Sequence, residues 1–314
     1  MILEDIKKIG IVGAGLMGHA LAQMFSLKGY KVNLFDHDQE ILDQVPKRVH
    51  RNLKAFIELG LVDELEAETC VNNIALCHDI KDIYSREDCI IIEAAIENLE
   101  TKKGIFAKLE KIVAPETILT SNTSAISITE ISRDLKFRER VVGTHFWNPP
   151  HIVPCVEVIK SEFTSQETFQ TVIAFLKKVG KEPVSVLKDV PGFLGNRMQH
   201  ALWREAISLV EKGIATAEDI DRVVKYSFGL RLVFIGPLET ADLAGLDLTF
   251  DVQKDLFPEL ENSKKPSGML TRMVERGETG VRTGKGFYEW SPEKIEQKIN
   301  QRDHVLLKIL NEVF

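Results

Sequence analysis

The sequence predicts an α/β protein, with a Rossmann-like, doubly wound N-terminal domain and an all-α C-terminal domain. Two observations predict this architecture. Short apolar, β-branched runs alternate with helical stretches over residues 1–189, which is typical of βαβ units around a parallel sheet. After Asp189–Gly192 the strand patterns all but vanish, while helical spacing continues. We therefore expect an α/β domain over residues 1–189 and a helical domain over residues 190–314.

The expected strands are short runs of apolar and β-branched residues. The first run contains no polar residue, as in a parallel strand that is buried on both faces. The strands are expected at Ile9–Val12, Val32–Phe35, Cys89–Ile92, Thr117–Leu119, Val141–Thr144 and Val184–Leu187. The helices between them are expected over Leu16–Leu27, from Gln39 to about Leu59, and over Lys102–Val113.

The second domain shows helical signals only. Apolar residues recur at spacings of three and four from Leu194 to Leu209, and Gly213 follows as a helix stop. Thr216, with Asp219 three residues later, predicts the N-cap of another helix.

Composition excludes several classes of protein. Hydrophobic residues make up 44% of the chain, enough to bury a sizeable core. A formal net charge of −7 leaves no excess of Lys and Arg to neutralise nucleic-acid phosphates. No apolar run approaches the ~20 residues of a membrane helix, and the N-terminus lacks a secretory apolar segment. The four cysteines include no Cys-x-x-Cys pair, so we expect a cytoplasmic protein without a metal site or disulfides.

A glycine pattern follows directly on the first expected strand. This GxGxxG consists of Gly13, Ala14, Gly15, Leu16, Met17 and Gly18. Between a strand and a helix, the pattern predicts a dinucleotide-binding turn. Gly13 permits the tight turn, Gly15 lets the backbone approach a pyrophosphate, and Gly18 lets the helix pack close to the strand. The anion would then lie on unpaired N–H groups at the helix N-terminus.

Asp36 ends the second expected strand, about twenty residues after the glycines. A carboxylate there accepts hydrogen bonds from both ribose hydroxyls and repels the 2′-phosphate of NADP. No arginine follows it, because His37 and Asp38 come next. The expected cofactor is therefore NAD. The alternative is a tight turn without a ligand, with Asp36 as an ordinary surface residue.

Further motifs follow in a fixed order. They are Glu97-Asn98-Leu99, Ser121-Asn122-Thr123-Ser124, His145-Phe146-Trp147-Asn148-Pro149-Pro150, Val156-Glu157-Val158-Ile159, Pro191-Gly192-Phe193-Leu194-Gly195-Asn196-Arg197 and Thr283-Gly284-Lys285-Gly286-Phe287-Tyr288. They resemble the motifs of the L-3-hydroxyacyl-CoA dehydrogenase superfamily and cover nearly the whole chain. The resemblance implies an NAD-binding Rossmann-like domain, a helical substrate and dimerisation domain, a homodimer, and a role in fatty acid metabolism.

The resemblance also implies roles for single residues. His145 becomes the catalytic base, and Glu157 its partner. Ser124 and Asn196 become polar residues that contact a small 3-hydroxy substrate. The residues implied to bind NAD are Gly13, Gly15, Leu16, Met17, Gly18, Asp36, Glu97, Lys102 and Asn122, and no metal ligand is implied.

The chemistry of alcohol oxidation independently supports a histidine. A secondary alcohol that loses hydride needs a proton acceptor, and histidine titrates nearest to neutral pH. A carboxylate on the far ring nitrogen would fix the tautomer and stabilise the imidazolium. Each residue also has a structural alternative: His145 could simply end a strand, and Glu157 could be a surface residue of an alternating strand. Ser124 could cap a turn, and Asn196 could serve the first turn of its helix.

Two further residues lie close to this motif in the sequence. His151 is a rival base in the same loop. Cys155 has no second cysteine or basic neighbour that would make it a nucleophile, so we expect it to pack in the core.

The substrate is less closely defined than the reaction. Trp147 stands where hydroxyacyl-CoA members usually carry a second Phe, and Pro149-Pro150-His151 follows. This run and the Phe234–Thr240 segment look more like relatives that oxidise free 3-hydroxy acids, which include L-gulonate dehydrogenase, L-carnitine dehydrogenase and a dehydrogenase of pyridoxine degradation. Basic residues that could hold CoA phosphates are equally typical of a solvated helix face; they are Lys47, Arg48, Arg51 and Lys54. The CoA thioester and a non-CoA acid both remain open.

A different class of function is a non-catalytic nicotinamide-binding protein, either a redox sensor or a structural protein. A sensor should carry a nucleic-acid-reading or partner-binding module, and the sequence contains no basic recognition helix. The retained Ser, His, Glu and Asn residues favour an enzyme.

Overall fold

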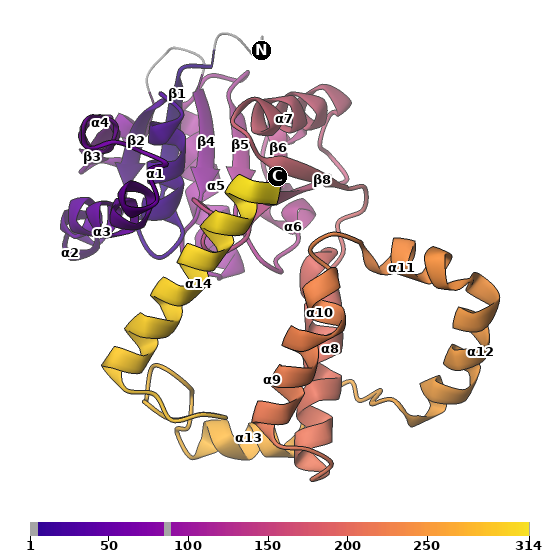
Figure 1. Cartoon of the computed structure of the whole chain (residues 1–314). Coiled ribbons are helices and arrows are strands. Elements are labelled where there is room, and N and C mark those ends of the chain that lie inside the picture. The colour runs from indigo at the N-terminus through magenta and orange to yellow at the C-terminus, as the bar shows by residue number, and fades with distance from the viewer. Residues whose placement is uncertain (1–5, 85–88, 314) are drawn as a thin grey trace. The chain divides into compact units, whose positions relative to one another are not determined.

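In a computed structural model, which describes residues 6–84 and 89–313, the first part of the chain forms one eight-stranded sheet (Figure 1). The strand order is β3-β2-β1-β4-β5-β6-β7-β8, and every neighbouring pair is parallel except the antiparallel β6 and β7. The strands are β1 (Lys8–Val12), β2 (Lys31–Phe35), β3 (Ile74–Cys77), β4 (Cys89–Glu93), β5 (Ile118–Ser121), β6 (Val141–Phe146), β7 (Cys155–Ile159) and β8 (Glu182–Val186). The chain order reverses between β1 and β4, which is where doubly wound sheets bind ligands.

The six expected strands are confirmed to within a few residues. The edge strand β3 was not expected, because Ile-Ala-Leu-Cys is short and shows no turn signal of its own. Its place in the sheet comes from parallel pairing with β2, which the local sequence does not reveal.

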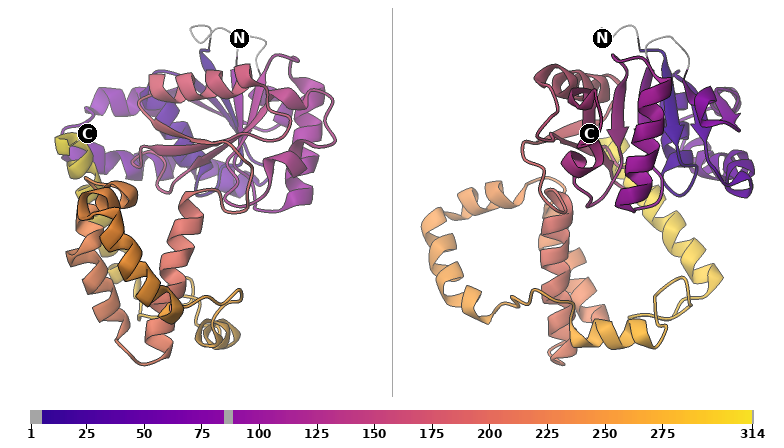
Figure 2. Two further views of the ribbon diagram at one scale, coloured as in Figure 1. Left: turned by 90° about the vertical axis from the view of Figure 1, so that its right-hand side faces the viewer. Right: turned by 180° about the vertical axis from the view of Figure 1, so that it is seen from behind.

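Helices cover both faces of this sheet (Figure 2). The helices and 3₁₀ turns are α1 (Gly18–Leu27), α2 (Gln39–Asp43), α3 (Val45–Glu58), α4 (Glu64–Asn72), η2 (Ile80–Ile83), α5 (Leu99–Ile112), α6 (Ile128–Ser132), η3 (Arg138–Arg140) and α7 (Gln166–Lys178). Apolar residues of α1, α3, α4 and α7 form one core layer, and those of α5 and α6 form the other.

The single helix expected from Gln39 to about Leu59 is two helices. Asp38 caps α2 with hydrogen bonds to the N–H groups of Glu40 and Ile41. The helix then breaks at Gln44, because Pro46 fits only the first turn of a new helix, α3. The amphipathic pattern continues across the break, so periodicity alone did not reveal it.

The second part of the chain is helical. Its elements are α8 (Gly195–Glu211), α9 (Ala217–Tyr226), α10 (Phe228–Arg231), α11 (Pro237–Ala244), α12 (Leu246–Leu256), η4 (Phe257–Glu259), α13 (Gly268–Glu275) and α14 (Pro292–Val313). The Thr216 cap is confirmed, because its side chain accepts a hydrogen bond from the N–H of Asp219. Of residues 197–298, only Ser208 and Met273 are buried.

The chain divides into two compact units, and each is described by itself. The first contains the residues up to Asn196 together with those from Ile299 onward, and the second contains Arg197–Lys298. The last turns of α14 belong to the first unit because Leu307 packs with Phe56 and Ile152. A domain boundary near residue 189 stays a prediction. None of the helices within the described residues has the length and apolar character needed to span a bilayer.

Candidate active site

The glycine turn lies between β1 and α1, at the carboxyl edge of the sheet. Gly13 has a φ of +104°, and a Cβ there would lie 2.6 Å from the carbonyl oxygen of Ala94. A Cβ on Gly18 would collide with the carbonyl oxygen of Gly13. Around Gly15, by contrast, an added Cβ would meet nothing within 4 Å. The turn is therefore tight on its inner side and open at Gly15, as a turn that admits a pyrophosphate needs to be.

No side chain caps the N-terminus of α1 at Met17, so the first N–H groups of this helix are free of side-chain partners. Asp36 lies beside the turn, and its Oδ2 accepts a hydrogen bond of 2.7 Å from the N–H of Ala14. Its Oδ1 accepts from the N–H of Asp38 at 3.0 Å, and the His37 ring lies 3.0 Å away. The side chain is only 7% exposed, so Asp36 is not an ordinary surface residue. These features fit a bound dinucleotide: open N–H groups for phosphate and a fixed carboxylate for ribose.

A buried ionic cluster lies at the ends of β4 and β5. Lys102 Nζ is 2.7 Å from Glu93 Oε1, and the two side chains are 1% and 0% exposed. Ser121 Oγ donates to Glu93 Oε2 at 2.6 Å, and the N–H of Ala95 donates to Oε1 at 2.7 Å. These hydrogen-bond and ion-pair partners of Glu93 and Lys102 are all groups of the protein itself. The sequence singled out Lys102 but not Glu93, which reads as the last residue of an apolar strand.

Glu97 connects this cluster to the loop after β5. Its Oε1 accepts from Thr123 Oγ1 at 2.6 Å and from the N–H groups of Ser124 and Ala125 at 2.8 and 3.1 Å. Its Oε2 lies 3.4 Å from Lys102 Nζ. Burial by itself would raise the pKa of Glu97, but these hydrogen bonds and the lysine charge outweigh it and lower the pKa. Glu97 therefore fixes the loop that carries Ser124.

Asn122, at the end of β5, forms hydrogen bonds to the ends of β4 and β6. Its N–H donates to the Glu93 carbonyl at 2.7 Å, and its Oδ1 accepts from the N–H of Phe146 at 2.8 Å. The sequence-predicted residues Asn122, Glu97 and Lys102 thus lie on one edge of the sheet. Their contact with NAD stays a prediction.

His145 and Glu157 form a pair across the antiparallel strands β6 and β7. The two residues are opposite each other in the register, and His145 Nδ1 lies 2.7 Å from Glu157 Oε2. Both side chains are buried. Glu157 Oε1 accepts from the N–H groups of Leu194 and Gly195 at 2.8 and 2.9 Å. The alternative that Glu157 is a surface residue is therefore wrong, because both of its oxygens are engaged inside the protein.

The carboxylate form of Glu157 is held in place by these contacts. Burial acts to raise the pKa of Glu157, but the hydrogen bond from the His145 ring and those from the two N–H groups together lower it. An ionised carboxylate at Nδ1 requires Nδ1 to carry the ring proton, which leaves Nε2 of a neutral His145 as a proton acceptor.

Aromatic rings surround the His145 imidazole. The Trp147 ring centroid lies 5.1 Å from that of His145, and the Phe193 centroid lies 5.8 Å away. Trp147 also packs so closely on Gly195 that any Cβ there would collide with the indole. From the sequence, Trp147 was only a departure from the family's His-Phe-Phe pattern. Its packing against the His145 ring was not predicted.

Ser124 and Asn196 also lie together. Asn196 Nδ2 donates to the carbonyl oxygen of Ser124 at 3.0 Å. No described contact uses the Ser124 hydroxyl, and the residue is exposed. Arg48, which the sequence left within a basic cluster, lies with Nη1 3.5 Å from the carbonyl of Ala14 in the glycine turn.

His151, the rival base, lies in different surroundings. Its ring packs against Phe56 with centroids 6.0 Å apart, and its buried Nδ1 has no hydrogen-bond partner. Burial lowers the pKa of His151 to about 3, with smaller effects from His19, Lys181 and Arg302. Within the part of the chain that the structure describes, no carboxylate orients this ring as Glu157 orients His145.

Two family descriptions match the chain almost end to end. Residues 8–190 match the 3-hydroxyacyl-CoA dehydrogenase NAD binding domain, and residues 192–290 match the 3-hydroxyacyl-CoA dehydrogenase C-terminal domain. A similar curated protein is the mitochondrial hydroxyacyl-coenzyme A dehydrogenase of Homo sapiens, which is 37% identical over 91% of this chain and 91% of that protein.

Two solved structures resemble the chain to different extents. A 5-formyl-3-hydroxy-2-methylpyridine 4-carboxylic acid 5-dehydrogenase, described as an NAD⁺-dependent dismutase, has 32% identity and a TM-score of 0.90 over 97% of both chains. The (S)-3-hydroxybutyryl-CoA dehydrogenase of Ralstonia eutropha has 34% identity and a TM-score of 0.75 over 91% of this chain and 99% of that one.

Proposed function

Because this chain belongs to the 3-hydroxyacyl-CoA dehydrogenase family and is an NAD-dependent oxidoreductase acting on CH–OH groups, we propose that it reversibly oxidises an L-3-hydroxyacyl-CoA to the 3-keto compound. The observation that carries this proposal is the buried 2.7 Å pair between His145 Nδ1 and Glu157 Oε2. Such a pair gives a neutral histidine one defined proton-accepting nitrogen.

The bound NAD⁺ supplies the hydride acceptor. His145 Nε2 removes the proton of the 3-hydroxyl group, and it returns the proton when the ketone is reduced. Glu157 stabilises the imidazolium that forms, and the N–H groups of Leu194 and Gly195 keep its carboxylate in place. The Ser124 hydroxyl and the Asn196 amide hold the reacting oxygen near His145.

The CoA thioester is the first candidate for the substrate's carrier, since both matched family descriptions are of 3-hydroxyacyl-CoA dehydrogenases. A non-CoA acid is the second candidate, and a specific observation favours it. The pyridine-carboxylate dehydrogenase superposes on this chain with a TM-score of 0.90, against 0.75 for the 3-hydroxybutyryl-CoA dehydrogenase of Ralstonia eutropha.

A substrate panel followed by NADH absorbance tests the reaction and the carrier. It compares 3-hydroxybutyryl-CoA, free 3-hydroxybutyrate, L-gulonate and L-carnitine. We expect the CoA thioester to have the highest kcat/KM. A higher value for a free acid would move the assignment to the second candidate. Absence of turnover with every 3-hydroxy compound would favour a non-catalytic NAD-binding protein.

The role of His145 is tested with two matched variants. We expect His145→Gln to lower kcat by ~10²–10⁴-fold, because a positioned general base typically contributes that much. His151→Gln changes the rival histidine in the same stretch of chain and should retain kcat within about threefold of the unmodified enzyme, an effect below 1 kcal/mol. NADH binding by fluorescence should persist in both. Loss of turnover in His151→Gln alone would assign the base to His151.

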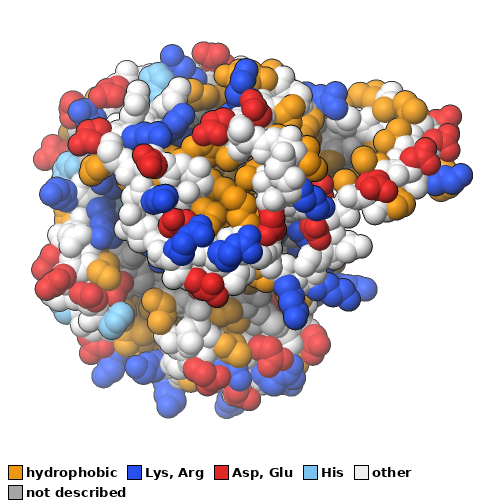
Figure 3. Space-filling model, turned by 90° about the horizontal axis from the view of Figure 1, so that it is seen from below, with side chains coloured by type: hydrophobic (Ala, Val, Ile, Leu, Met, Phe, Trp, Pro, Cys, Tyr) orange, Lys and Arg blue, Asp and Glu red, His pale blue; other side chains and the backbone are white. Residues whose placement is uncertain are grey.

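We also propose that the chain forms a homodimer through residues 197–298. Most large apolar residues there are exposed, with Tyr226, Leu238 and Leu243 each 79–80% accessible. Apolar side chains also lie open among charged ones on the face in Figure 3. Apolar surface of this extent is typical of a protein interface. Light scattering after size exclusion should give twice the mass of 35.4 kDa, and a monomer at micromolar concentration would contradict the proposal.

A further inference from the structure

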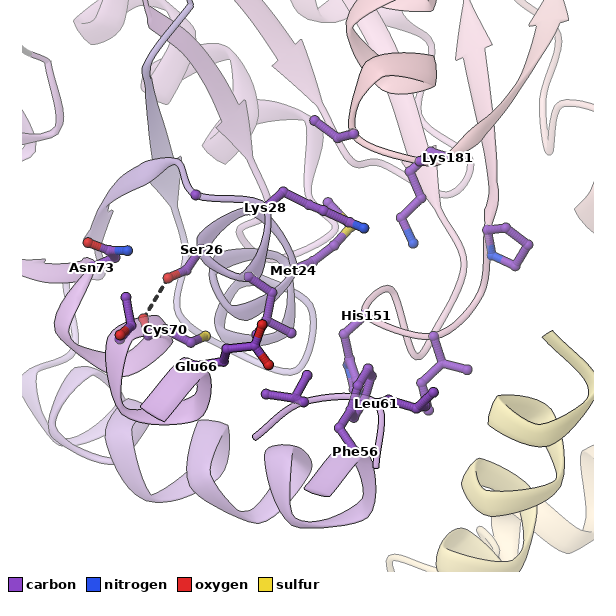
Figure 4. Close-up of a pocket in the computed structure, with 18 of the residues that line it drawn as sticks. Met24, Ser26, Lys28, Phe56, Leu61, Glu66, Cys70, Asn73, His151 and Lys181 are labelled. Carbon is purple, nitrogen blue, oxygen red and sulfur yellow. Dashed lines mark hydrogen bonds between the residues drawn. The ribbon is translucent and has the colours of Figure 1, made fainter. Parts of the chain in front are cut away.

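A cavity of about 1010 Å³ lies in the first unit, away from the glycine turn. It is lined by the C-terminal end of α1, by α3 and α4, by the loop before β7 and by the turn before β8 (Figure 4). The glycine turn is at the other end of α1, a helix of 10 residues and hence about 15 Å long. The cavity is therefore separate from the dinucleotide turn, and its volume is at the upper end of typical ligand pockets, about 300–1,000 Å³.

One wall of the cavity is apolar. Met24 comes from α1, Phe56 and Leu61 come from the end of α3 and the turn after it, and Ile152 comes from the loop before β7. Leu310 adds an apolar side chain from the last turns of α14. A hydrocarbon group against this wall would gain ~25 cal/mol for each Å² that it removes from water.

The neutral polar residues of the cavity are already paired inside the protein. Ser26 Oγ donates to the carbonyl of Cys70 at 2.5 Å, and Thr69 Oγ1 donates to the carbonyl of Leu65 at 2.7 Å. Asn73 Oδ1 accepts from Lys31 Nζ at 2.7 Å. These groups therefore leave little hydrogen-bonding capacity for a neutral polar ligand.

Two lysines differ from these residues, because no carboxylate balances them. Lys181 is buried at 6% exposure, and its Nζ donates to the carbonyls of Pro150 and Val153 at 2.7 and 2.8 Å. Lys28 Nζ lies 3.7 Å from where a Cβ on Gly180, the residue before Lys181, would be. Among the described residues, neither lysine forms an ion pair, and Figure 4 shows both reaching toward the same opening. Burial, and then the charge of Lys28, lower the pKa of Lys181 to about 8.

The acidic residues of the cavity do not neutralise the lysines. Glu66 uses its carboxylate in the capping box of α4, where Oε2 accepts from the N–H of Asp63 at 2.9 Å. Glu182 is exposed and has no described contact with Lys28 or Lys181. The His151 ring, by contrast, lies against Phe56 of the apolar wall, with the ring centroids 6.0 Å apart (Figure 4). The polar end of the cavity thus has donors and positive charge but lacks an anion.

We propose that this cavity binds a monocarboxylate with a hydrocarbon tail, of the fatty-acid class. The carboxylate lies between Lys28 and the remaining N–H of Lys181, where it forms charge-assisted hydrogen bonds. The tail lies on the wall formed by Met24, Phe56 and Leu61. A single negative charge offsets the repulsion between the two ammonium groups, and the apolar wall selects a chain over a small inorganic anion. This site does not depend on the dehydrogenase assignment.

Isothermal titration of the full chain with sodium decanoate, below its micellar concentration, tests the proposal. We expect saturable binding at about one site, and at least ~10-fold weaker binding by Lys28→Gln, because that variant loses one charge-assisted hydrogen bond to the carboxylate. Leu61→Ser should also weaken binding. The matched control is Lys177→Gln, an exposed lysine that does not line the cavity, and it should bind decanoate like the unmodified chain.

Three results would overturn the proposal. One is the absence of saturable binding up to ~5 mM, which corresponds to only about 3 kcal/mol of affinity. Another is equal binding of decanoate and decyltrimethylammonium, which would indicate apolar association without recognition of the charge. The third is competition between decanoate and NADH or CoA, which would place the ligand in the active site. Turnover is measured separately, so failure of this site and failure of the proposed reaction are distinguishable.

Discussion

His145 and His151 lie in one short stretch of chain, yet their surroundings are opposite. His145 meets the carboxylate of Glu157 at 2.7 Å, and that carboxylate is held by two backbone N–H groups. His151 is half-buried, and among the described residues its buried Nδ1 has no hydrogen-bond partner and no carboxylate pairs with its ring. Burial first, and then the nearby positive charges, lower the pKa of His151 and keep its ring neutral, whereas the Glu157 carboxylate fixes the orientation and tautomer of the His145 ring. The difference shows that the partner, rather than the histidine, decides the chemistry.

The largest expected effect comes from removing the partner of His145. Glu157→Gln keeps the size of the side chain but not its charge, so the imidazolium loses its stabilising anion. We expect kcat to fall by ~10²–10⁴-fold with little change in NADH affinity. Because Glu157 acts through His145, the double variant with His145→Gln should be about as slow as His145→Gln alone. Multiplicative losses in the double variant would contradict this coupling.

The buried Glu93–Lys102 pair differs from both histidines. Its carboxylate is paired with an ammonium group, and neither residue takes part in the proposed proton transfer. Lys102→Met leaves the fully buried Glu93 without its cation, and we expect a loss of ~3–5 kcal/mol in the free energy of unfolding by urea. Glu93→Leu combined with Lys102→Met should recover only part of this loss, because it removes the buried charge but leaves Ser121 Oγ and the N–H of Ala95 without their acceptor. The adjacent Lys103→Met breaks only an exposed pair with Asp134 and should cost less than ~1 kcal/mol. Equal losses for the two lysine variants would contradict a buried, charge-balanced cluster.

The smallest expected effect is the pH dependence of stability that His151 causes. The folded state holds the pKa of His151 at about 3, below its ordinary value of 6.5, so below pH 6.5 the unfolded chain binds a proton that the folded chain does not. Stability from this group is therefore present above pH 6.5 and is lost as the pH falls toward 3. Between pH 6.5 and pH 5 the loss is about 1.6 kcal/mol, and His151→Phe should abolish that part.

The measurement for this last prediction is urea unfolding at both pH values, with His50→Phe as an exposed control. Three neighbouring groups, Lys181, His19 and Arg302, act in the same direction on His151. An identical pH dependence in His151→Phe and the unmodified chain would show that the histidine is solvated in solution.

The sequence predicted the parts of the site that depend on local order along the chain. Gly13, Gly18 and Asp36 work through one strand–turn–helix unit, so their spacing was informative. The candidate pair of His145 and Glu157 came from the family resemblance, and their contact depends on the antiparallel register of β6 and β7.

Other features were not predicted, each for a different reason. In the sequence, Glu93 is only the last residue of an apolar strand. Its ion pair depends on the position of α5, which carries Lys102. The surroundings of His151 require Phe56 and the turn at Lys181, which are far from it in sequence. The break at Gln44 was hidden because the amphipathic pattern continues into α3.

The return of α14 to the first unit has a consequence for synthesis of the chain. Leu307 is made after the whole helical unit, yet it completes the apolar cluster with Phe56 and Ile152. The helical unit is therefore an insertion, and the sheet unit leaves the ribosome with one apolar face still uncovered. During translation this face is covered only after Leu307 has been made, so a nascent chain stalled before Ile299 should be a preferred client of chaperones that bind exposed apolar surface.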